Sequence, residues 1–138
     1  MLQEERRLLV CGSRTITDKN WIYSQIESYW YEHLACYSDP IMIEGAARGV
    51  DLIAKAYAVE NDWKIEEYPA DWSIGRQAGI LRNIKMYKNT DEVLVLWDGN
   101  SRGTKHTIGL CEKGNKPYTI IIYPHDFHDE NTIKKNYN

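Results

Sequence analysis

The sequence predicts a doubly wound, three-layer α/β sandwich around a five-stranded parallel sheet. Short apolar segments alternate with segments whose apolar residues recur at helical spacing, which is the pattern of parallel strands joined by helices. Polar loops that contain glycine follow several of the apolar segments, as expected where a strand leads into a helix. Right-handed crossovers leave few topologies for such a chain, and we expect the strand order 3-2-1-4-5.

The first predicted strand covers residues 7–11, an apolar segment of the kind that is buried on both faces of a parallel sheet. Thr17 or Asp18 can cap the helix that follows, because a short polar side chain can accept a hydrogen bond from the N–H groups of the first helical turn. The residues at helical spacing in this segment are Ile22, Ile26, Tyr29, Trp30 and His33.

A second strand and a second helix follow a predicted turn at residues 39–40. Residues 41–43 form the strand, and residues 44–49 form a loop of small residues. From Val50 onward, apolar residues fall at relative positions 0, 3, 4, 7 and 8, which indicates an amphipathic helix. Residues 63–68 form the third predicted strand.

The second half of the chain continues the alternation. Its predicted elements are a long loop at 69–76, a helix with apolar residues at Ile80, Leu81, Ile84 and Tyr87, a strand at 92–97, a polar loop at 98–103, a helix at 104–113 and a last strand at 117–123. We expect one domain over residues 1–123 and a polar C-terminal tail over residues 124–138.

Composition disfavours several classes of protein. The chain has 138 residues, of which 43% are hydrophobic and 27% are charged, as expected of a globular domain with one core. The net charge of -3 disfavours a nucleic-acid partner. No apolar segment reaches the roughly 18 residues of a membrane span, so we expect no membrane partner. The three widely spaced cysteines are typical of free thiols in a reducing cytoplasm.

Three loops carry the residues that suit an anion. They follow the first, second and fourth predicted strands and should meet at one edge of the sheet, beside the switch point between strands one and four. Each contains a glycine and an arginine and precedes a helix N-terminus. Glycines can also serve only to make tight turns, but three such loops at one edge favour an anion site. The candidate ligand-binding residues are Gly12, Ser13, Arg14, Glu44, Gly45, Arg48, Gly49, Asp98, Ser101, Gly103 and Thr104.

The segment 69–86 adds further candidates for ligand binding. Asp71 and Trp72 are suited to hold a ribose and to stack on a base. Arg76, Arg82 and Asn83 add donors, and guanidinium groups match phosphate well. The alternative is structural: Trp72 packs in the core, Arg76 is solvated and Asn83 caps a loop.

The sequence carries no standard cofactor or metal motif. Neither G-x-G-x-x-G nor G-x-x-x-x-G-K-[ST] occurs, so a plain NAD enzyme or P-loop NTPase is disfavoured. His125 and His128 make only a weak H-x-x-H pattern, and we expect no metal and no cofactor. If the protein is an enzyme, Arg82, Asp98 and Glu44 are the catalytic candidates.

Four motifs in order resemble one known family. "VCGSRTITD", "EGAARGVDLIAKAYA", "PADW…GRQAGILRNIKM" and "DGNSRGTKHTI" resemble the DUF2493 group, the YspA-like, YpsA-related branch of the SLOG superfamily. The resemblance covers about residues 8–123. It implies a Rossmann-like fold and a pocket for a nucleotide or nucleotide-derived ligand that carries ribose and phosphate. The superfamily includes cytokinin-activating phosphoribohydrolases, the DNA-processing protein DprA and sensors of nucleotide signals.

The resemblance also bears on catalysis. The phosphoribohydrolases carry a motif similar to PGGxGTxxE, and an Arg-Lys pair on an upstream helix. Arg82 and Met86 match that helix, with Asn83 in place of the lysine, and the motif's glutamate position is Thr107. The missing carboxylate favours a sensor or sequestering module. The alternatives are an N-glycosidic hydrolase of nucleoside monophosphates and a DprA-like binder of single-stranded DNA.

The first predicted helix suggests assembly. Its large rings point to more than one side of the helix, and Tyr and Trp are enriched at the centres of interfaces. We therefore expect a homodimer or a larger homo-oligomer, the alternative being that neighbouring elements cover this helix. The rings are Trp21, Tyr23, Tyr29, Trp30 and Tyr31.

Overall fold

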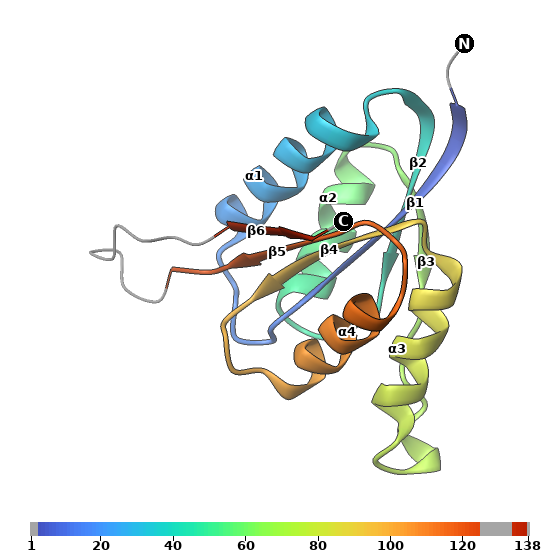
Figure 1. Ribbon diagram of the computed structural model, residues 1–138, viewed down its shortest axis with the longest axis vertical. Coiled ribbons are helices and arrows are strands. Elements are labelled where there is room, and N and C mark those ends of the chain that lie inside the picture. Colours follow the sequence, from blue (N-terminus) through green and yellow to red (C-terminus); the bar gives the residue numbers. More distant parts are fainter. Residues whose placement is uncertain (1–2, 125–133, 138) are drawn as a thin grey trace.

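One sheet forms the centre of the computed structural model, which describes residues 3–124 and 134–137 (Figure 1). Its strands are β1 (Gln3–Gly12), β2 (Tyr37–Glu44), β3 (Lys64–Glu67), β4 (Glu92–Trp97), β5 (Tyr118–Ile122) and β6 (Lys134–Tyr137). The strand order is β3-β2-β1-β4-β5-β6. The first five strands are parallel, which confirms the predicted order 3-2-1-4-5.

The sixth strand was not predicted. β6 pairs antiparallel with β5 and lies in the segment that the sequence assigned to a polar tail. Its sequence, Lys-Lys-Asn-Tyr, has no apolar alternation. An edge strand can pair through backbone hydrogen bonds alone, so it does not need such a pattern. The pattern therefore gave no signal for it.

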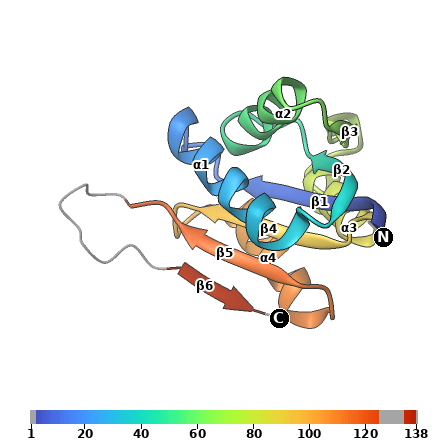
Figure 2. The same ribbon diagram turned by 90° about the horizontal axis from the view of Figure 1, so that it is seen from above.

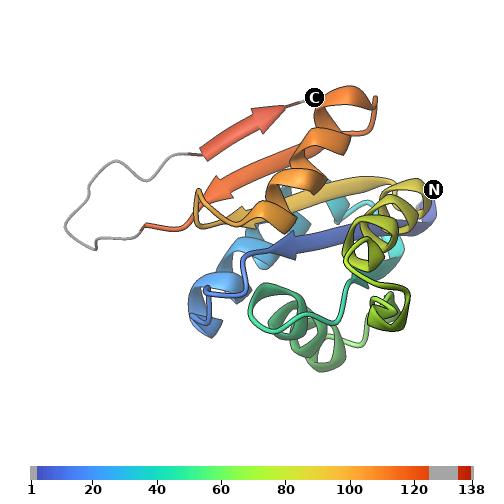
Figure 3. The same cartoon turned by 90° about the horizontal axis from the view of Figure 1, so that it is seen from below.

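Four α-helices cover the sheet from both sides. They are α1 (Lys19–Tyr29), α2 (Val50–Glu60), α3 (Ala78–Asn89) and α4 (Arg102–Lys113). Figures 2 and 3 show α1 and α2 on one face and α3 and α4 on the other, so the molecule has three layers. A π-helical turn (Trp30–Leu34) extends α1, and a 3-10 turn (Trp72–Ile74) precedes α3.

The core is divided by the sheet into two clusters. Side chains alternate along β1: Leu8 and Val10 pack under α1 and α2, whereas Leu9 and Cys11 pack under α3 and α4. The central strand β4 is buried on both faces from Glu92 to Leu96. This double burial explains why its sequence is a continuous apolar run rather than an alternating one.

Several predicted boundaries are wrong. β1 and β2 each begin four residues earlier than predicted. Helix α4 begins at Arg102 rather than at residue 104. The turn predicted at residues 39–40 lies inside β2, because Pro40 pairs with Arg6 of β1 while pairing with β3 begins only at Ile41. Proline lacks the N–H that a ladder needs, and it is tolerated where a strand has a neighbour on one side only.

The rings of α1 are mostly covered within the chain. Tyr29 is buried, and Trp21, Tyr23 and Trp30 pack against the core cluster. The Trp21 ring meets Tyr123 edge-on at 4.8 Å between centroids. Tyr31 is 68% exposed. A homo-oligomer built on α1 stays a prediction.

Of the two caps predicted for α1, Thr17 and Asp18, the structure shows Asp18. Its side chain accepts a hydrogen bond from the N–H of Trp21 at 3.0 Å. None of the described helices is long and apolar enough to cross a membrane. All three cysteines lie in the described residues, and none forms a disulfide.

Candidate functional site

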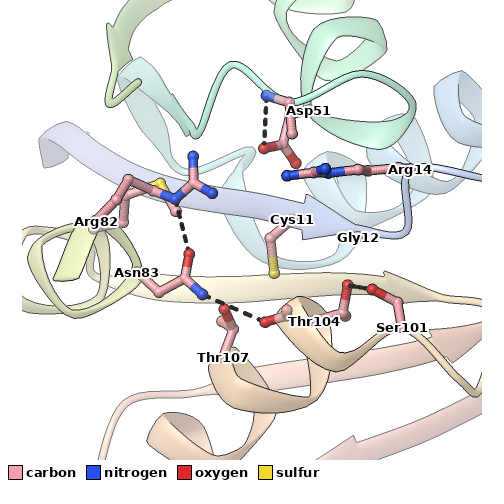
Figure 4. Close-up of a pocket in the computed structure, with 12 residues that line it drawn as sticks. Cys11, Gly12, Arg14, Asp51, Arg82, Asn83, Ser101, Thr104 and Thr107 are labelled. Atoms are coloured by element: carbon pink, nitrogen blue, oxygen red, sulfur yellow. Dashed lines mark hydrogen bonds between the residues drawn. The ribbon is translucent and has the colours of Figure 1, made fainter. Parts of the chain in front are cut away.

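A cavity of about 270 Å³ lies at the carboxyl ends of β1 and β4 (Figure 4). These two neighbouring strands continue into α1 and α4, which lie on opposite faces of the sheet, so the cavity occupies the switch point of the fold. It is lined by Cys11, Gly12, Arg14, Ala47, Asp51, Arg82, Asn83, Met86, Ser101, Gly103, Thr104 and Thr107. Seven of the predicted site residues are therefore brought together here: Gly12, Arg14, Arg82, Asn83, Ser101, Gly103 and Thr104.

Two glycines let the loops approach closely. A Cβ on Gly12 would lie 2.1 Å from the carbonyl oxygen of Leu96, so only glycine fits where β1 ends beside β4. Gly49 has a φ of 81°, and a Cβ there would lie 2.6 Å from the carbonyl oxygen of Ser13. These contacts hold the loops after β1, β2 and β4 around the cavity.

Ser13 joins the loops instead of lining the cavity. It is completely buried, and its N–H donates to the carbonyl oxygen of Leu96 at 3.1 Å. Its Oγ accepts a hydrogen bond from the N–H of Asp98 at 2.9 Å. Ser13 was a candidate ligand-binding residue, but its hydroxyl and its N–H are both used within the protein.

Asp98 organises the loop that leads into α4. Its Oδ1 accepts from the N–H groups of Asn100 and Ser101, each at 2.8 Å, and its Oδ2 accepts from the Thr15 hydroxyl at 2.9 Å. Burial opposes the charged form, but these hydrogen bonds prevail and lower the pKa of Asp98 to about 2. The carboxylate is ionised and held by the loop, and it does not line the cavity.

The N-terminus of α4 faces the cavity without a side-chain cap. Ser101 is the N-cap residue, yet its side chain makes no capping hydrogen bond to the helix. The hydroxyls of Ser101 and Thr104 lie 3.1 Å apart, and both residues line the cavity together with Gly103. An open helix N-terminus presents N–H groups and a positive dipole end, which suits an anion.

Arg82 ties α3 to the other loops. Its Nη1 donates to the carbonyl oxygen of Gly45 and also, at 3.4 Å, to that of Tyr68. Its Nε donates to Oδ1 of Asn83 at 2.9 Å, and Nδ2 of Asn83 reaches the carbonyl oxygen of Gly103 at 3.4 Å. Arg82 and Asn83 therefore connect the loop after β2 with the start of α4.

Arg14 brings a second guanidinium to the cavity. It is exposed, no hydrogen bond or ion pair to the described residues holds it, and its charge acts on the Asp51 carboxylate. In Figure 4 its side chain extends beside Asp51. Two guanidinium groups thus face one carboxylate.

Asp51 is the carboxylate that lines the cavity, and it is not among the candidate residues predicted from the sequence. It is 5% exposed, and its Oδ2 accepts from the N–H of Ala47 at 3.3 Å. Burial raises the pKa of Asp51 to about 6, although the Ala47 N–H and the charge of Arg82 oppose this shift. A carboxylate at the second position of α2, just after a small-residue loop, was the available signal.

Cys11 and Thr107 were also missed as lining residues. The Cys11 side chain points into the cavity from β1 (Figure 4). Burial raises the pKa of the Cys11 thiol well above its ordinary value, so the thiol is neutral. Thr107 lies one turn after Thr104 on the inner face of α4, and that helical spacing is the signal that could have found it.

A second hollow of about 110 Å³ adjoins the cavity and shares Arg14, Ala47 and Arg82 with it. It adds two predicted residues, Gly45 and Trp72. Trp72 is 56% exposed and lies outside the core. An exposed indole beside an arginine-lined cavity offers a flat surface for stacking.

Glu44 lies apart from the cavity. It is fully buried, and its Oε1 accepts from the N–H of Ala46 at 2.7 Å. Burial and the neighbouring Glu67 carboxylate raise the pKa of Glu44 to about 8, so it is a neutral acid at pH 7. Hydrogen bonds from Glu44 and from Lys55, which lies 3.1 Å away, lower the pKa of Glu67.

The remaining predicted residues are also placed elsewhere. Arg48 and Arg76 are exposed and line none of the described hollows. Asp71 caps the 3-10 turn by accepting from the N–H of Ser73 at 3.2 Å. No group of three or more His, Cys, Asp or Glu side chains among the described residues could hold a metal ion, and His125 and His128 lie outside them.

Two comparisons with known proteins show what this chain is similar to. The sequence model of the family described as "YspA, cpYpsA-related SLOG family" matches residues 6–75. The chain is also 30% identical over 123 residues to the Gene 61 protein of Mycobacterium phage D29, and the match covers 81% of this chain and 93% of that protein. The family match contains most of β1, and all of α1, β2, α2, β3 and the Trp72 turn.

Proposed function

The chain belongs to the YspA, cpYpsA-related SLOG family, and on this premise we propose that it binds a small nucleotide or nucleotide-derived ligand as a sensor or sequestering module. Membership of the SLOG family suggests a nucleotide-related function. The ligand carries ribose and phosphate and lies at the carboxyl ends of β1 and β4.

One observation carries this proposal: two guanidinium groups and an uncapped helix N-terminus converge on one cavity. Arg14 lines it from the loop after β1 and Arg82 lines it from α3, and α4 begins at its wall. Hydrogen bonds between guanidinium groups and phosphate are charge-assisted and about twice as strong as neutral ones. The cavity volume of about 270 Å³ suits a small anion far better than a polymer.

The neighbouring groups supply contacts for the rest of a nucleotide. We assign the phosphate to the α4 N-terminus, beside the hydroxyls of Ser101 and Thr104. Asp51 lies across the cavity, and its carboxylate can accept hydrogen bonds from the hydroxyls of a ribose. The base then lies in the adjoining hollow, against the exposed ring of Trp72.

The residues that line the cavity favour binding over hydrolysis. The position of the hydrolase glutamate is Thr107, which lines the cavity with a hydroxyl. Glu44 lies outside the cavity, and Asp98 is engaged by its own loop. Asp51 is the carboxylate that lines the cavity and can act as a general base, so base release from AMP is the second candidate function. Loss of that release in Asp51→Asn would establish it.

Calorimetry with AMP, ADP-ribose, NAD and ribose 5-phosphate tests the proposal. Arg14→Ala should raise the Kd of the bound ligand about tenfold or more, as for the loss of a charge-assisted hydrogen bond. Arg48→Ala is the matched control, because it removes an exposed arginine that lines no hollow, and it should leave the Kd unchanged. Absence of binding below millimolar concentration for all four ligands would contradict the proposal.

A further inference from the structure

The loop between β2 and α2 forms one wall of the ligand site. Ala47 lines both the cavity and the adjoining hollow, and Gly45 and Ala46 line the hollow. Ala46 has a φ of 62°, the left-handed conformation that a residue with a Cβ adopts only at a cost in free energy. Contacts with the rest of the protein must therefore hold this loop in its observed shape.

Two carboxyl groups hold the backbone of this loop. The N–H of Ala47 donates to Oδ2 of Asp51 at 3.3 Å. The N–H of Ala46, the residue in the left-handed conformation, donates to Oε1 of Glu44 at 2.7 Å. Asp51 lines the cavity itself, whereas Glu44 does not and can affect the site only through the loop.

The second oxygen of Glu44 is satisfied when it carries a proton. The side chain is fully buried, and Oε2 has no hydrogen-bond donor within reach among the described residues. The register of β2 and β3 pairs Glu44 with Glu67, whose carboxylate lies 3.1 Å from the Lys55 ammonium group. A protonated Glu44 donates to that carboxylate, so both of its oxygens are bonded. The two acids therefore share one proton, which resides on Glu44.

The charged groups around Glu44 come from three elements. Glu67 of β3 and Asp51 of α2 oppose the ionisation of Glu44, whereas Arg82 of α3 favours it. Lys55 of α2 faces Glu67 and stabilises the negative charge there. Burial and the two carboxylates prevail, and they raise the pKa of Glu44 to about 8. An ionised Glu44 is a buried charge beside like charges, which favours movement of its carboxylate away from Glu67, and with it the acceptor that holds the loop.

We propose that the protonated carboxyl group of Glu44 is a positioning group of the ligand site, and that the loop of residues 45–47 loosens and the ligand binds more weakly when this proton is lost. This inference rests on the proposed function, because it concerns the affinity of that same site. Loss of the Ala46 contact frees a left-handed residue to relax, and the neighbouring Ala47 lines the cavity. The site therefore binds its ligand tightly near neutral pH and weakly in alkaline solution.

Calorimetry with AMP at pH 7 and at pH 9 tests the proposal. The Kd of the wild type should rise about tenfold, as expected if the protonated form of a group with a pKa of about 8 binds best. Glutamine keeps an acceptor for the Ala46 N–H and a donor for Glu67, so Glu44→Gln should have the wild-type Kd at pH 7 and keep it at pH 9. Glu66→Gln is the matched control: the Glu66 carboxylate is on the same strand as Glu67 but accepts from Arg7, so this variant should keep the tenfold change.

Hydrogen exchange in the ligand-free protein separates failure of this proposal from failure of the proposed function. Comparison of the wild type with Glu44→Gln at the same pH cancels the intrinsic effect of pH on exchange. The amides of Ala46 and Ala47 should exchange about tenfold faster in the wild type at pH 9, and equally fast in both proteins at pH 7.

Two outcomes would overturn the role of Glu44: equal exchange in the wild type and in Glu44→Gln at pH 9, or an equal change of Kd in both between pH 7 and pH 9. Absence of AMP binding at pH 7 together with the expected difference in exchange would contradict the proposed function, while supporting the hold of Glu44 on the loop.

Discussion

The N–H of Asp98 donates to the hydroxyl oxygen of Ser13 at 2.9 Å, and this contact joins the loops that follow β1 and β4. Ser13 is completely buried, and its own N–H is bound to Leu96. At the switch point of this fold, the Ser13 side chain therefore bonds to a neighbouring loop, although its position in the sequence suggests a ligand contact. Its role here is to hold two loops at a fixed separation.

Ser13→Ala should destabilise the protein more than it affects the ligand. It leaves the N–H of Asp98 without its acceptor, and an unpaired buried donor costs about 1–3 kcal/mol in the free energy of unfolding. Urea denaturation measures this loss. Ser28→Ala, which removes an exposed hydroxyl from α1, is the control and should change stability by less than about 0.5 kcal/mol. Equal stability of the two variants would contradict the structural role of Ser13.

Gly49→Ala and Gly109→Ala should have opposite effects on stability. Gly49 has a φ of 81°, and a Cβ there would lie 2.6 Å from the carbonyl oxygen of Ser13. We therefore expect Gly49→Ala to lower the free energy of unfolding by about 2 kcal/mol or more. Gly109 lies inside α4 with no atom within 4 Å of an added Cβ, so alanine there should gain about 0.5–1 kcal/mol. Thermal unfolding of both variants checks the pair, and a stabilising Gly49→Ala would disprove the account of the loop.

Glu44→Gln should change how stability depends on pH. The pKa of Glu44 is raised to about 8 in the fold, so this group stabilises the protein at low pH and loses that contribution as pH rises from its unfolded pKa of 4.5 to about 8. Glutamine keeps the shape and has no proton to lose. The wild type should therefore lose more stability than Glu44→Gln between pH 5 and pH 8, by about 1.4 kcal/mol or more. Urea denaturation measures both proteins at the two pH values. An equal change in the free energy of unfolding for the wild type and for Glu44→Gln would refute the raised pKa.

Asp51→Asn tests the ribose contact of the proposed ligand. The wild type should bind AMP more tightly than 2′-deoxy-AMP, because the Asp51 carboxylate accepts from ribose hydroxyls. Asparagine is a weaker acceptor for those hydroxyls, so the preference should shrink about tenfold or more. Calorimetry at pH 8, above the Asp51 pKa of about 6, keeps the wild-type group ionised. An unchanged preference would place the ribose elsewhere while leaving the phosphate site intact.

The order of strands and the edge that carries the cavity could be predicted from the sequence. Apolar segments such as residues 92–97 differ from the helical stripe that begins at Val50, because buried strands and amphipathic helices have different periods. The handedness of crossovers then left few topologies, and the order expected among them is the observed one. Loops at the carboxyl ends of parallel strands must meet at one edge, so Arg14 and Gly103 were expected to lie near each other, as they do.

The direction in which each polar group points was decided only by the tertiary structure. Ser13 and Asp98 bond each other's loops, whereas Asp51 faces the cavity, although all three lie at the same edge of the sheet. Residue type and spacing place a side chain at an edge to within a few ångströms. A shift of less than a few ångströms is enough to make or break a hydrogen bond. The distance between donor and acceptor depends on how α2, α3 and α4 pack over the strands.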